Sequence, residues 1–321
     1  MEYRNLGRSG LRVSATGLGC NNLGRPGTAT ESSEGASAVV HTAIDSGINF
    51  FDTADMYGGR FGLSETLLGE ALRGRRDEVV IATKFGHNDF GSPIENWGAK
   101  ASRRYIRRAV EASLERLQTD WIDLYQLHTP SPLVPVDETL AALDELVQAG
   151  KVRYVGHSNF AAWQLVEADY VARELGSTRF VSAQNEYSLL VRDAERELLP
   201  AAERYGVGLL PFFPLYNGVF TGKYSREGGP EGTRIMRQKR HLLDTVPWDA
   251  VDALEKFGRA RDLSMLQVTF GWLLSKTVLS SVIAGATTPE QVRQNAAASS
   301  AWTPSFEEAA EIDALFPLNE R

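Results

Sequence analysis

An aspartate and a tyrosine stand close together at the end of a short apolar run, in the stretch Phe50-Phe51-Asp52-Thr53-Ala54-Asp55-Met56-Tyr57-Gly58. The apolar residues from 48 to 51 predict a buried strand, and the glycines at 58 and 59 mark the loop beyond it. A carboxylate and a phenol therefore leave the carboxyl end of a strand, where parallel α/β folds hold their active sites. Packing or capping is the ordinary role of such a tyrosine, so the chemical interpretation depends on what else reaches the same place.

Two more apolar runs end in a side chain that can do chemistry, Lys84 after residues 79–83 and His128 after residues 123–127. A lysine that ends a buried strand is costly without a partner, and Asp52 on the neighbouring strand is the expected one. A structural ion pair is one interpretation. The chemical interpretation adds Tyr57, because a nearby ammonium lowers the pKa of a phenol towards neutrality, where it can donate a proton. His128 can then hydrogen-bond a substrate carbonyl, although a lone histidine is more often a core residue.

The elements that must position these side chains alternate along the chain. Short apolar segments are the expected strands: Thr16–Gly19, Ile48–Thr53, Val79–Lys84, Asp123–His128, Arg153–Ser158, Phe180–Tyr187, Gly206–Phe213 and Ser280–Ala286. Amphipathic segments between them are the expected helices, for example Ala36–Ser46, Ser64–Leu72, Arg104–Leu117, Asp137–Ala149, Ala161–Leu175 and Glu195–Tyr205. Eight strands with helical crossovers predict a closed (β/α)₈ TIM barrel.

The same pattern predicts the rest of the architecture. Residues 3–14 are expected to form a β-hairpin, and the loops at the carboxyl ends of the strands are extended, the longest lying between the seventh and eighth strands with an irregular stretch at 225–232. The segments Ser264–Gln267 and Thr288–Gln291 both fit a capping box, and the second supplies an expected anion site directly after the last strand. No change of composition divides the chain, so we expect a single domain over residues 1–321.

Composition excludes several classes of function. A net charge of −7 disfavours nucleic acid or an anionic membrane as the main partner. The single cysteine, Cys20, permits no intrachain disulfide, and the charged amino terminus lacks an apolar leader, so we expect a cytoplasmic protein without membrane spans. The five histidines are scattered, so no metal is expected. No heptad or apolar stripe indicates an oligomeric state.

Six separated motifs together resemble the aldo-keto reductase family, in the right order and over essentially the whole chain: Asp52-Thr53-Ala54…Tyr57-Gly58, Lys84, His128, Gly156-His157-Ser158-Asn159-Phe160, Gln184 and Thr288-Pro289-Glu290-Gln291…Asn295. The resemblance implies an NAD(P)H-dependent oxidoreductase that reduces aldehydes or ketones to alcohols. Its catalytic residues would be Asp52, Tyr57, Lys84 and His128, with Tyr57 as the general acid.

The resemblance also implies a cofactor site. Ser158, Asn159 and Gln184 would hold the nicotinamide carboxamide, and Phe212 would stack on the ring. The loop with Gly218, Gly222 and Lys223 would lie along the pyrophosphate, and the adenosine end would meet Gly285, Thr287, Gln291 and Asn295.

The adenosine end departs from the family, because the Lys-Ser pair and the Arg that many members use for a 2′-phosphate are absent. Thr287, Thr288 and Gln291 can still hydrogen-bond a phosphate, and Arg234 or the basic run from Arg237 to Arg240 can fold over it. NADPH is therefore the expected cofactor, with NADH as the alternative.

The substrate, a small carbonyl compound, would be lined by residues around the barrel opening. Asn21, Met56 and Trp97 are the expected wall residues, together with Asn22, Phe90 and Tyr216, and surface packing is the equal alternative for each.

Two other functions remain open. One is an NAD-dependent dehydrogenase of a sugar or alcohol, which the weak 2′-phosphate signature would suit. The other is a redox-sensing, cofactor-binding regulatory subunit, because the same family fold also serves ion channels in that way. The complete set of four catalytic residues favours an enzyme.

Overall fold

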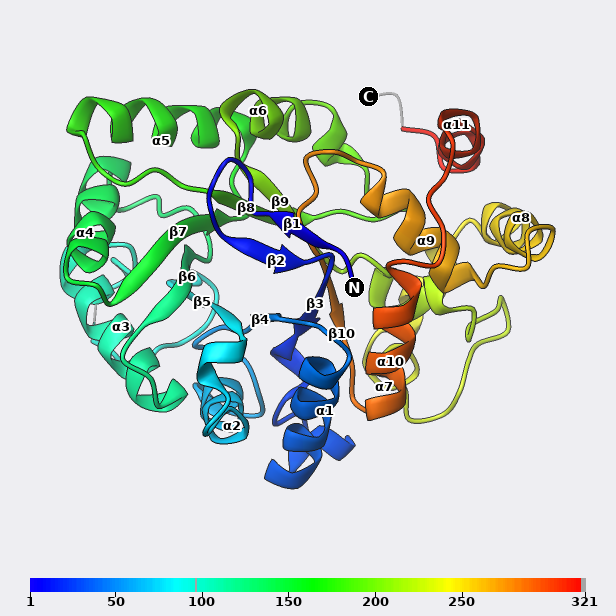
Figure 1. Cartoon of the computed structure of the whole chain (residues 1–321), viewed down its shortest axis with the longest axis horizontal. Helices are drawn as coiled ribbons and strands as arrows, with labels where there is room; N and C mark the ends of the chain where they lie inside the picture. The colour runs from blue at the N-terminus through cyan, green and yellow to red at the C-terminus, as the bar shows by residue number, and fades with distance from the viewer. Residues whose placement is uncertain (96, 319–321) are drawn as a thin grey trace.

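The computed structural model describes residues 1–95 and 97–318, and its centre is a nearly closed barrel of eight parallel strands (Figure 1). The strands are β3 (Thr16–Gly19), β4 (Phe50–Asp52), β5 (Val80–Phe85), β6 (Ile122–Leu127), β7 (Val152–Ser158), β8 (Ser182–Glu186), β9 (Gly208–Phe212) and β10 (Val282–Gly285). They lie in the order β10-β3-β4-β5-β6-β7-β8-β9, and the circle closes where Leu209 of β9 pairs in parallel with Leu279, just before β10. The predicted (β/α)₈ barrel is confirmed.

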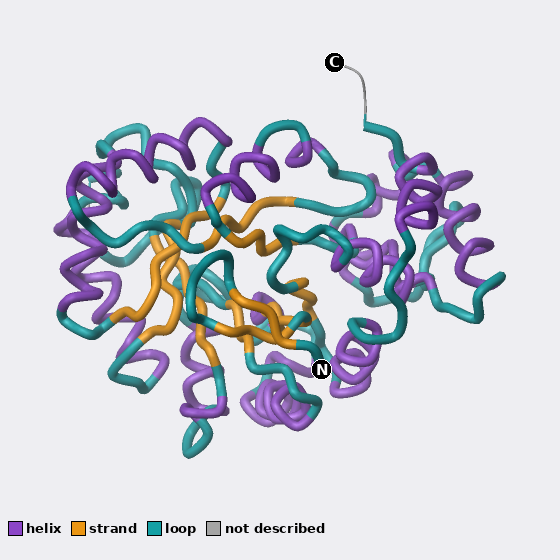
Figure 2. Tube along the Cα trace, turned by 45° about the horizontal axis from the view of Figure 1, so that its top comes forward, coloured by secondary structure: helices purple, strands orange, loops and turns teal. Residues whose placement is uncertain are grey.

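Helices surround the strands, as Figure 2 shows with strands in orange and helices in purple. Seven of them are α1 (Ser33–Asp45), α2 (Leu63–Ala71), α3 (Arg103–Leu117), α4 (Val136–Gln148), α5 (Ala162–Leu175), α6 (Leu198–Tyr205) and α10 (Pro289–Ala298). The connection from β9 to β10 adds α7 (Arg234–Gln238), α8 (Trp248–Arg259) and α9 (Met265–Leu274), and α11 (Phe306–Leu315) follows α10. Residues 225–232 contain no helix, as expected, and only an isolated bridge joins Ser225 to Gly228.

The predicted hairpin is present as β1 (Tyr3–Asn5) and β2 (Arg12–Ser14), and it covers the amino end of the barrel (Figure 1). Leu6 and Val13 are fully buried in one cluster with Phe50 and other side chains of the barrel interior. The backbone nitrogen of Arg8 donates to the carbonyl of Gly206 at 2.8 Å, just before β9 begins. The hairpin therefore plugs the floor of the barrel and leaves the carboxyl end for chemistry.

One expected strand start and one expected capping box are wrong for local reasons. The seventh strand begins at Gly208 rather than at Gly206, because Gly206 has φ 73° and ends α6 in the left-handed conformation. At α10, the Thr288 hydroxyl accepts from the Gln291 nitrogen at 3.3 Å, but the Gln291 side chain accepts from Thr287 at 2.8 Å rather than from Thr288. The predicted capping box is thus only half formed there, whereas the box at Ser264 is complete.

Within the described residues, no helix combines the length and the apolar character that a membrane crossing needs.

Candidate active site

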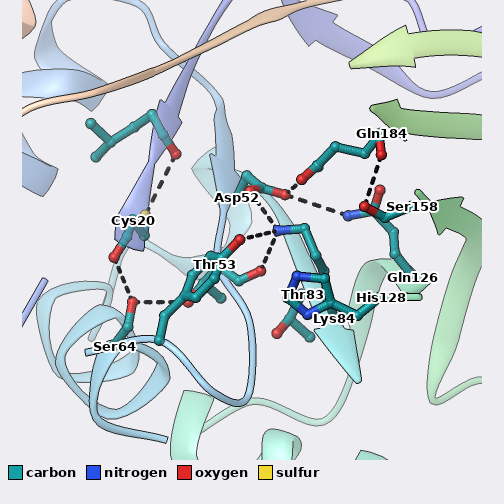
Figure 3. A network of polar contacts seen from close by, with 12 residues as sticks. Cys20, Asp52, Thr53, Ser64, Thr83, Lys84, Gln126, His128, Ser158 and Gln184 are labelled. Carbon is teal, nitrogen blue, oxygen red and sulfur yellow. Dashed lines mark hydrogen bonds and ion pairs between the residues drawn. The ribbon is translucent and has the colours of Figure 1, made fainter. Parts of the chain in front are cut away.

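Asp52, Lys84 and His128 meet at the carboxyl end of the barrel, as Figure 3 shows. Lys84 Nζ donates to Asp52 Oδ2 at 2.6 Å, to the Thr53 carbonyl at 2.9 Å and to the Tyr57 hydroxyl at 3.4 Å. The Lys84 side chain is completely buried and that of Asp52 almost completely. The predicted pairing of Lys84 with Asp52 is confirmed, and it extends to Tyr57.

A tight turn after β4 holds Tyr57 over the lysine. The Tyr57 nitrogen donates to the Ala54 carbonyl at 3.1 Å, and the Ser64 nitrogen at the start of α2 donates to the Tyr57 carbonyl at 3.1 Å. Gly58 has φ 104°, and a Cβ there would lie 2.8 Å from Leu63. Only glycine allows both this conformation and this approach, so the glycine sets the direction of Tyr57.

The second oxygen of Asp52 is bound by two amides. Gln184 Nε2 on β8 donates to Asp52 Oδ1 at 2.8 Å, and Gln126 Nε2 on β6 donates to it at 3.4 Å. Sequence reasoning placed Gln184 at the cofactor and did not single out Gln126. A glutamine within an otherwise apolar strand was the available signal, because a buried amide needs a polar partner.

The pKa of Tyr57 corrects the expectation of a lowered value. Burial raises the pKa of the phenol, the Lys84 ammonium opposes that shift only in part, and Asp52 adds to it, so the pKa lies above its usual value. For Lys84, burial lowers the pKa because it disfavours the charged form. The negative charges of Asp52 and Tyr57 outweigh this effect, and the net shift of the Lys84 pKa is upward. Tyr57 therefore holds its proton and Lys84 its charge at physiological pH.

His128 follows β6 and faces Tyr57 edge to face, with ring centroids 5.8 Å apart. Burial, with smaller contributions from Lys84 and His87, holds its pKa well below the usual range, so the imidazole is neutral. Its Nδ1 is buried and has no hydrogen-bond partner within residues 1–95 and 97–318. A neutral imidazole with spare hydrogen-bonding capacity suits the binding of a carbonyl.

The loop after β5 adds an aromatic wall that sequence reasoning only partly identified. The His87 ring lies edge to face with His128 at 4.6 Å and with Phe90 at 4.7 Å. Lys100 Nζ holds this loop, because it donates to the carbonyls of His87 at 2.7 Å, of Asn88 at 3.1 Å and of Phe90. Phe90 was an expected wall residue, whereas His87, directly after the strand, and Lys100 were missed.

The three residues expected to bind the nicotinamide carboxamide lie next to Asp52 and His128. Ser158 Oγ donates to the Gln184 carbonyl at 2.8 Å. Asn159, which has φ 61°, donates from Nδ2 to Ser158 Oγ and to the His128 carbonyl, both at 3.0 Å. The Ser158 hydroxyl and the Gln184 side-chain carbonyl keep acceptor capacity for an amide NH₂ group.

The loop after β9 is the one expected to lie along the pyrophosphate. Phe212 ends β9 half-buried, with its ring edge to face with Phe213 at 5.3 Å. Gly218 has φ 101° and Gly222 φ 80°, so the backbone turns twice in a conformation that favours glycine. The Lys223 ammonium folds back towards Gly218, and burial lowers its pKa. The Gly218 nitrogen donates to the Leu215 carbonyl at 2.9 Å and the Gly222 nitrogen to the Val219 carbonyl at 3.4 Å, so a contact of this loop with a diphosphate stays a prediction.

The residues expected at the adenosine end lie around β10 and the start of α10. Gln291 Oε1 accepts from Thr287 N at 2.8 Å and from Thr287 Oγ1 at 3.2 Å. Asn295 is buried, and Gly285 is exposed beside the Asn22 side chain. These positions stay predictions for cofactor contact.

The predicted substrate residues are spread around the opening. Asn21 and Met56 are half-buried in the loops after β3 and β4. Trp97 is 75% exposed, and its ring packs on the guanidinium carbon of Arg104 at 4.8 Å. A substrate role for each of the three stays a prediction.

Comparison with known proteins agrees with this geometry. The sequence model described as the Aldo/keto reductase family matches residues 15–316. An uncharacterized oxidoreductase of Bacillus subtilis, YrpG, is 39% identical over 91% of this chain and 89% of its own. A probable voltage-gated potassium channel subunit beta of Oryza sativa is 35% identical, over 92% and 90%. An L-glyceraldehyde 3-phosphate reductase of Escherichia coli O157:H7 is 33% identical, over 98% and 92%.

Proposed function

Because the chain belongs to the aldo/keto reductase family, we propose that it reduces an aldehyde or ketone to an alcohol with NADPH as the cofactor. One observation carries the proposal: Lys84 Nζ contacts both Asp52 Oδ2, at 2.6 Å, and the Tyr57 hydroxyl, at 3.4 Å, at the open end of the barrel. The reductases and oxidoreductases among its relatives support the general reaction.

The chain's own residues handle the proton. Tyr57 donates its hydroxyl proton to the carbonyl oxygen, which forms the O–H bond of the alcohol and leaves a phenolate. The Lys84 ammonium, fixed by Asp52, stabilises that negative charge, and water then returns a proton to Tyr57. His128, being neutral, orients the carbonyl oxygen. NADPH, when bound, supplies the hydride that forms the new C–H bond and is oxidised to NADP⁺.

The residues present fit such a cofactor. Acceptors at Ser158 and Gln184 suit the carboxamide, the Phe212 ring suits an offset stack, and the Gly218–Gly222 turns with Lys223 suit a diphosphate. The preference for NADPH rests on Thr287 and on the other hydroxyl and amide groups around the start of α10.

The first test compares initial rates of oxidation of NADPH and NADH with 4-nitrobenzaldehyde, an activated neutral aldehyde. We expect turnover with both, and a kcat/KM for NADPH at least about tenfold higher, as a charge-assisted phosphate contact would give. A clear preference for NADH would instead favour the alternative of an NAD-dependent dehydrogenase that oxidises a sugar or alcohol.

A regulatory function is the second candidate, and the potassium channel subunit beta among the relatives favours it. The same assay separates the two candidates. Tight binding of NADPH without turnover of a broad panel of aldehydes would support a redox-sensing subunit and contradict the enzyme.

The pH dependence follows from the directions of the pKa shifts. The active form of Tyr57 is protonated, and because its pKa is raised, this form persists until the pH exceeds its ordinary value of about 10. Burial and the charge of Glu65 raise the pKa of Asp55 to about 8. When Asp55 ionises, its negative charge raises the pKa of the Tyr57 phenol further, so Tyr57 stays protonated. The active form of His128 is neutral, and because its pKa is lowered, this form survives as the pH falls through 6.5.

We therefore expect kcat/KM for 4-nitrobenzaldehyde to be flat from about pH 6 to 9 and to fall only in stronger base. The measurement is a pH profile in a constant-ionic-strength buffer. An inflection near pH 6.5 that disappears in His128→Asn would mean that His128 titrates there and would contradict the neutral assignment.

A further inference from the structure

Two loops meet at the opening of the barrel and bring four cations together. The Gly59 nitrogen donates to the Gly24 carbonyl at 2.9 Å, so Arg25 directly follows a residue bound to the turn that carries Tyr57. From the other side, Arg237 Nη1 donates to the Gly27 carbonyl at 3.5 Å. We call the set Arg25, Arg234, Arg237 and Lys239 the mouth cations.

Two of the mouth cations, Arg234 and Lys239, lie over the ring of Phe213. The Arg234 guanidinium carbon is 5.4 Å from the centroid of Phe213, and Lys239 Nζ is 5.0 Å from it. Arg234 Nε is buried and has no hydrogen-bond partner in the described part of the chain. Lys239 Nζ has one, the side-chain carbonyl of Asn217 at 3.4 Å. Much of the hydrogen-bond donor capacity of Arg234 and Lys239 is therefore unused.

Carboxylates do not balance this charge. Within residues 1–95 and 97–318, no mouth cation lies in an ion pair with Asp or Glu. Burial and the charges of Arg234 and Arg237 lower the pKa of Arg25 to about 10. Two carboxylates lie near the set: Glu186 opposes the lowering of the Lys239 pKa, and Glu31 accepts from the Gly27 nitrogen at 2.7 Å. Four like charges at one opening of a chain with net charge −7 repel one another unless an anion joins them.

The contacts of these cations lie between the loop after β3 and the loop after β9. They reach Asn21, Gly27, Phe213 and Asn217, and no hydrogen bond or ion pair in the described residues joins them directly to Thr287 or Gln291. The expectation that the basic run folds over a 2′-phosphate stays a prediction. The cations also lie beside the turn that carries Tyr57, because Gly24, which precedes Arg25, accepts from the Gly59 nitrogen.

We propose that the mouth cations bind the phosphate or carboxylate group of an anionic aldehyde whose carbonyl carbon lies at Tyr57. Guanidinium groups match both anions through paired hydrogen bonds, and a partly desolvated site strengthens them. This inference rests on the proposed function, because the reaction is the same reduction by NADPH with the proton from Tyr57. A phosphate of the cofactor is the other source of the same chemistry.

The test uses a matched pair of aldehydes, 4-carboxybenzaldehyde and methyl 4-formylbenzoate, at saturating NADPH. We expect kcat/KM to be at least about tenfold higher for the carboxylate, and this ratio to fall about tenfold in Arg25→Gln. Arg25→Lys keeps the charge and should retain part of the ratio. Arg259→Gln, an exposed arginine on α8, is the control for net charge and should leave the ratio unchanged. Raising the salt from 0.05 to 0.5 M should also reduce the ratio.

The outcomes separate the two proposals. Equal kcat/KM for the two aldehydes in the wild type would overturn the inference while leaving the reductase function standing. An Arg25→Gln variant with a KM for NADPH at least tenfold higher and an unchanged ratio would assign the cations to the cofactor. If neither aldehyde turns over, the proposed function fails. Titration of the NADP⁺-saturated protein with 4-carboxybenzyl alcohol then tests the anion site, and equal binding to wild type and Arg25→Gln would overturn it.

Discussion

Replacing Tyr57 with phenylalanine is expected to lower kcat for 4-nitrobenzaldehyde about a thousandfold, within the usual range for loss of a general acid. The change removes one hydroxyl. The ring that faces His128 at 5.8 Å and lies 4.8 Å from Lys84 Nζ stays in place. The Kd of NADPH, measured by quenching of tryptophan fluorescence, should therefore change less than about twofold, because the loss concerns the transition state only.

The control for this variant is Tyr3→Phe, on the hairpin at the opposite end of the barrel. It removes a hydroxyl that donates to the carbonyl of Gly47, in the loop between α1 and β4. It should leave kcat unchanged. If Tyr57→Phe kept more than a tenth of the wild-type kcat, Tyr57 would not be the proton donor, whatever its distance from Lys84.

Much of this site could be predicted from the sequence, because barrel topology fixes which strand ends are neighbours. Asp52, Lys84 and His128 each end or follow an apolar run, and β4, β5 and β6 pair in that order. Parallel pairing then brings the three side chains to one end without any knowledge of the loops. The predicted ion pair and the confirmed barrel both follow from this regularity.

The rest depends on tertiary contacts that no local pattern encodes. The direction of the Tyr57 pKa shift results from burial and an ammonium acting in opposite senses, and the effect of burial is the larger. The wall made by His87 exists because Lys100, thirteen residues later, binds carbonyls of that loop. The mouth cations come from segments about two hundred residues apart, so only the folded chain brings them together.

Lys84→Met is the second variant with a large expected effect, and it acts on stability as well as on activity. Among the described residues, it leaves the buried Asp52 carboxylate with only the amides of Gln184 and Gln126 as partners. Removing one member of a buried ion pair lowers the free energy of unfolding by about 3 to 5 kcal/mol. We expect a loss of this size in urea unfolding, and a kcat lower by at least about a hundredfold.

The double variant Asp52→Asn with Lys84→Met separates the structural and chemical roles of the pair. It removes the uncompensated charge, so its free energy of unfolding should exceed that of Lys84→Met alone by about 2 kcal/mol. Its kcat should stay as low as in the single variant, because no ammonium stabilises the phenolate that Tyr57 leaves when it gives up its proton. Recovery of kcat together with stability would mean that Lys84 serves only to neutralise Asp52, and that the contact of 3.4 Å to Tyr57 has no chemical consequence.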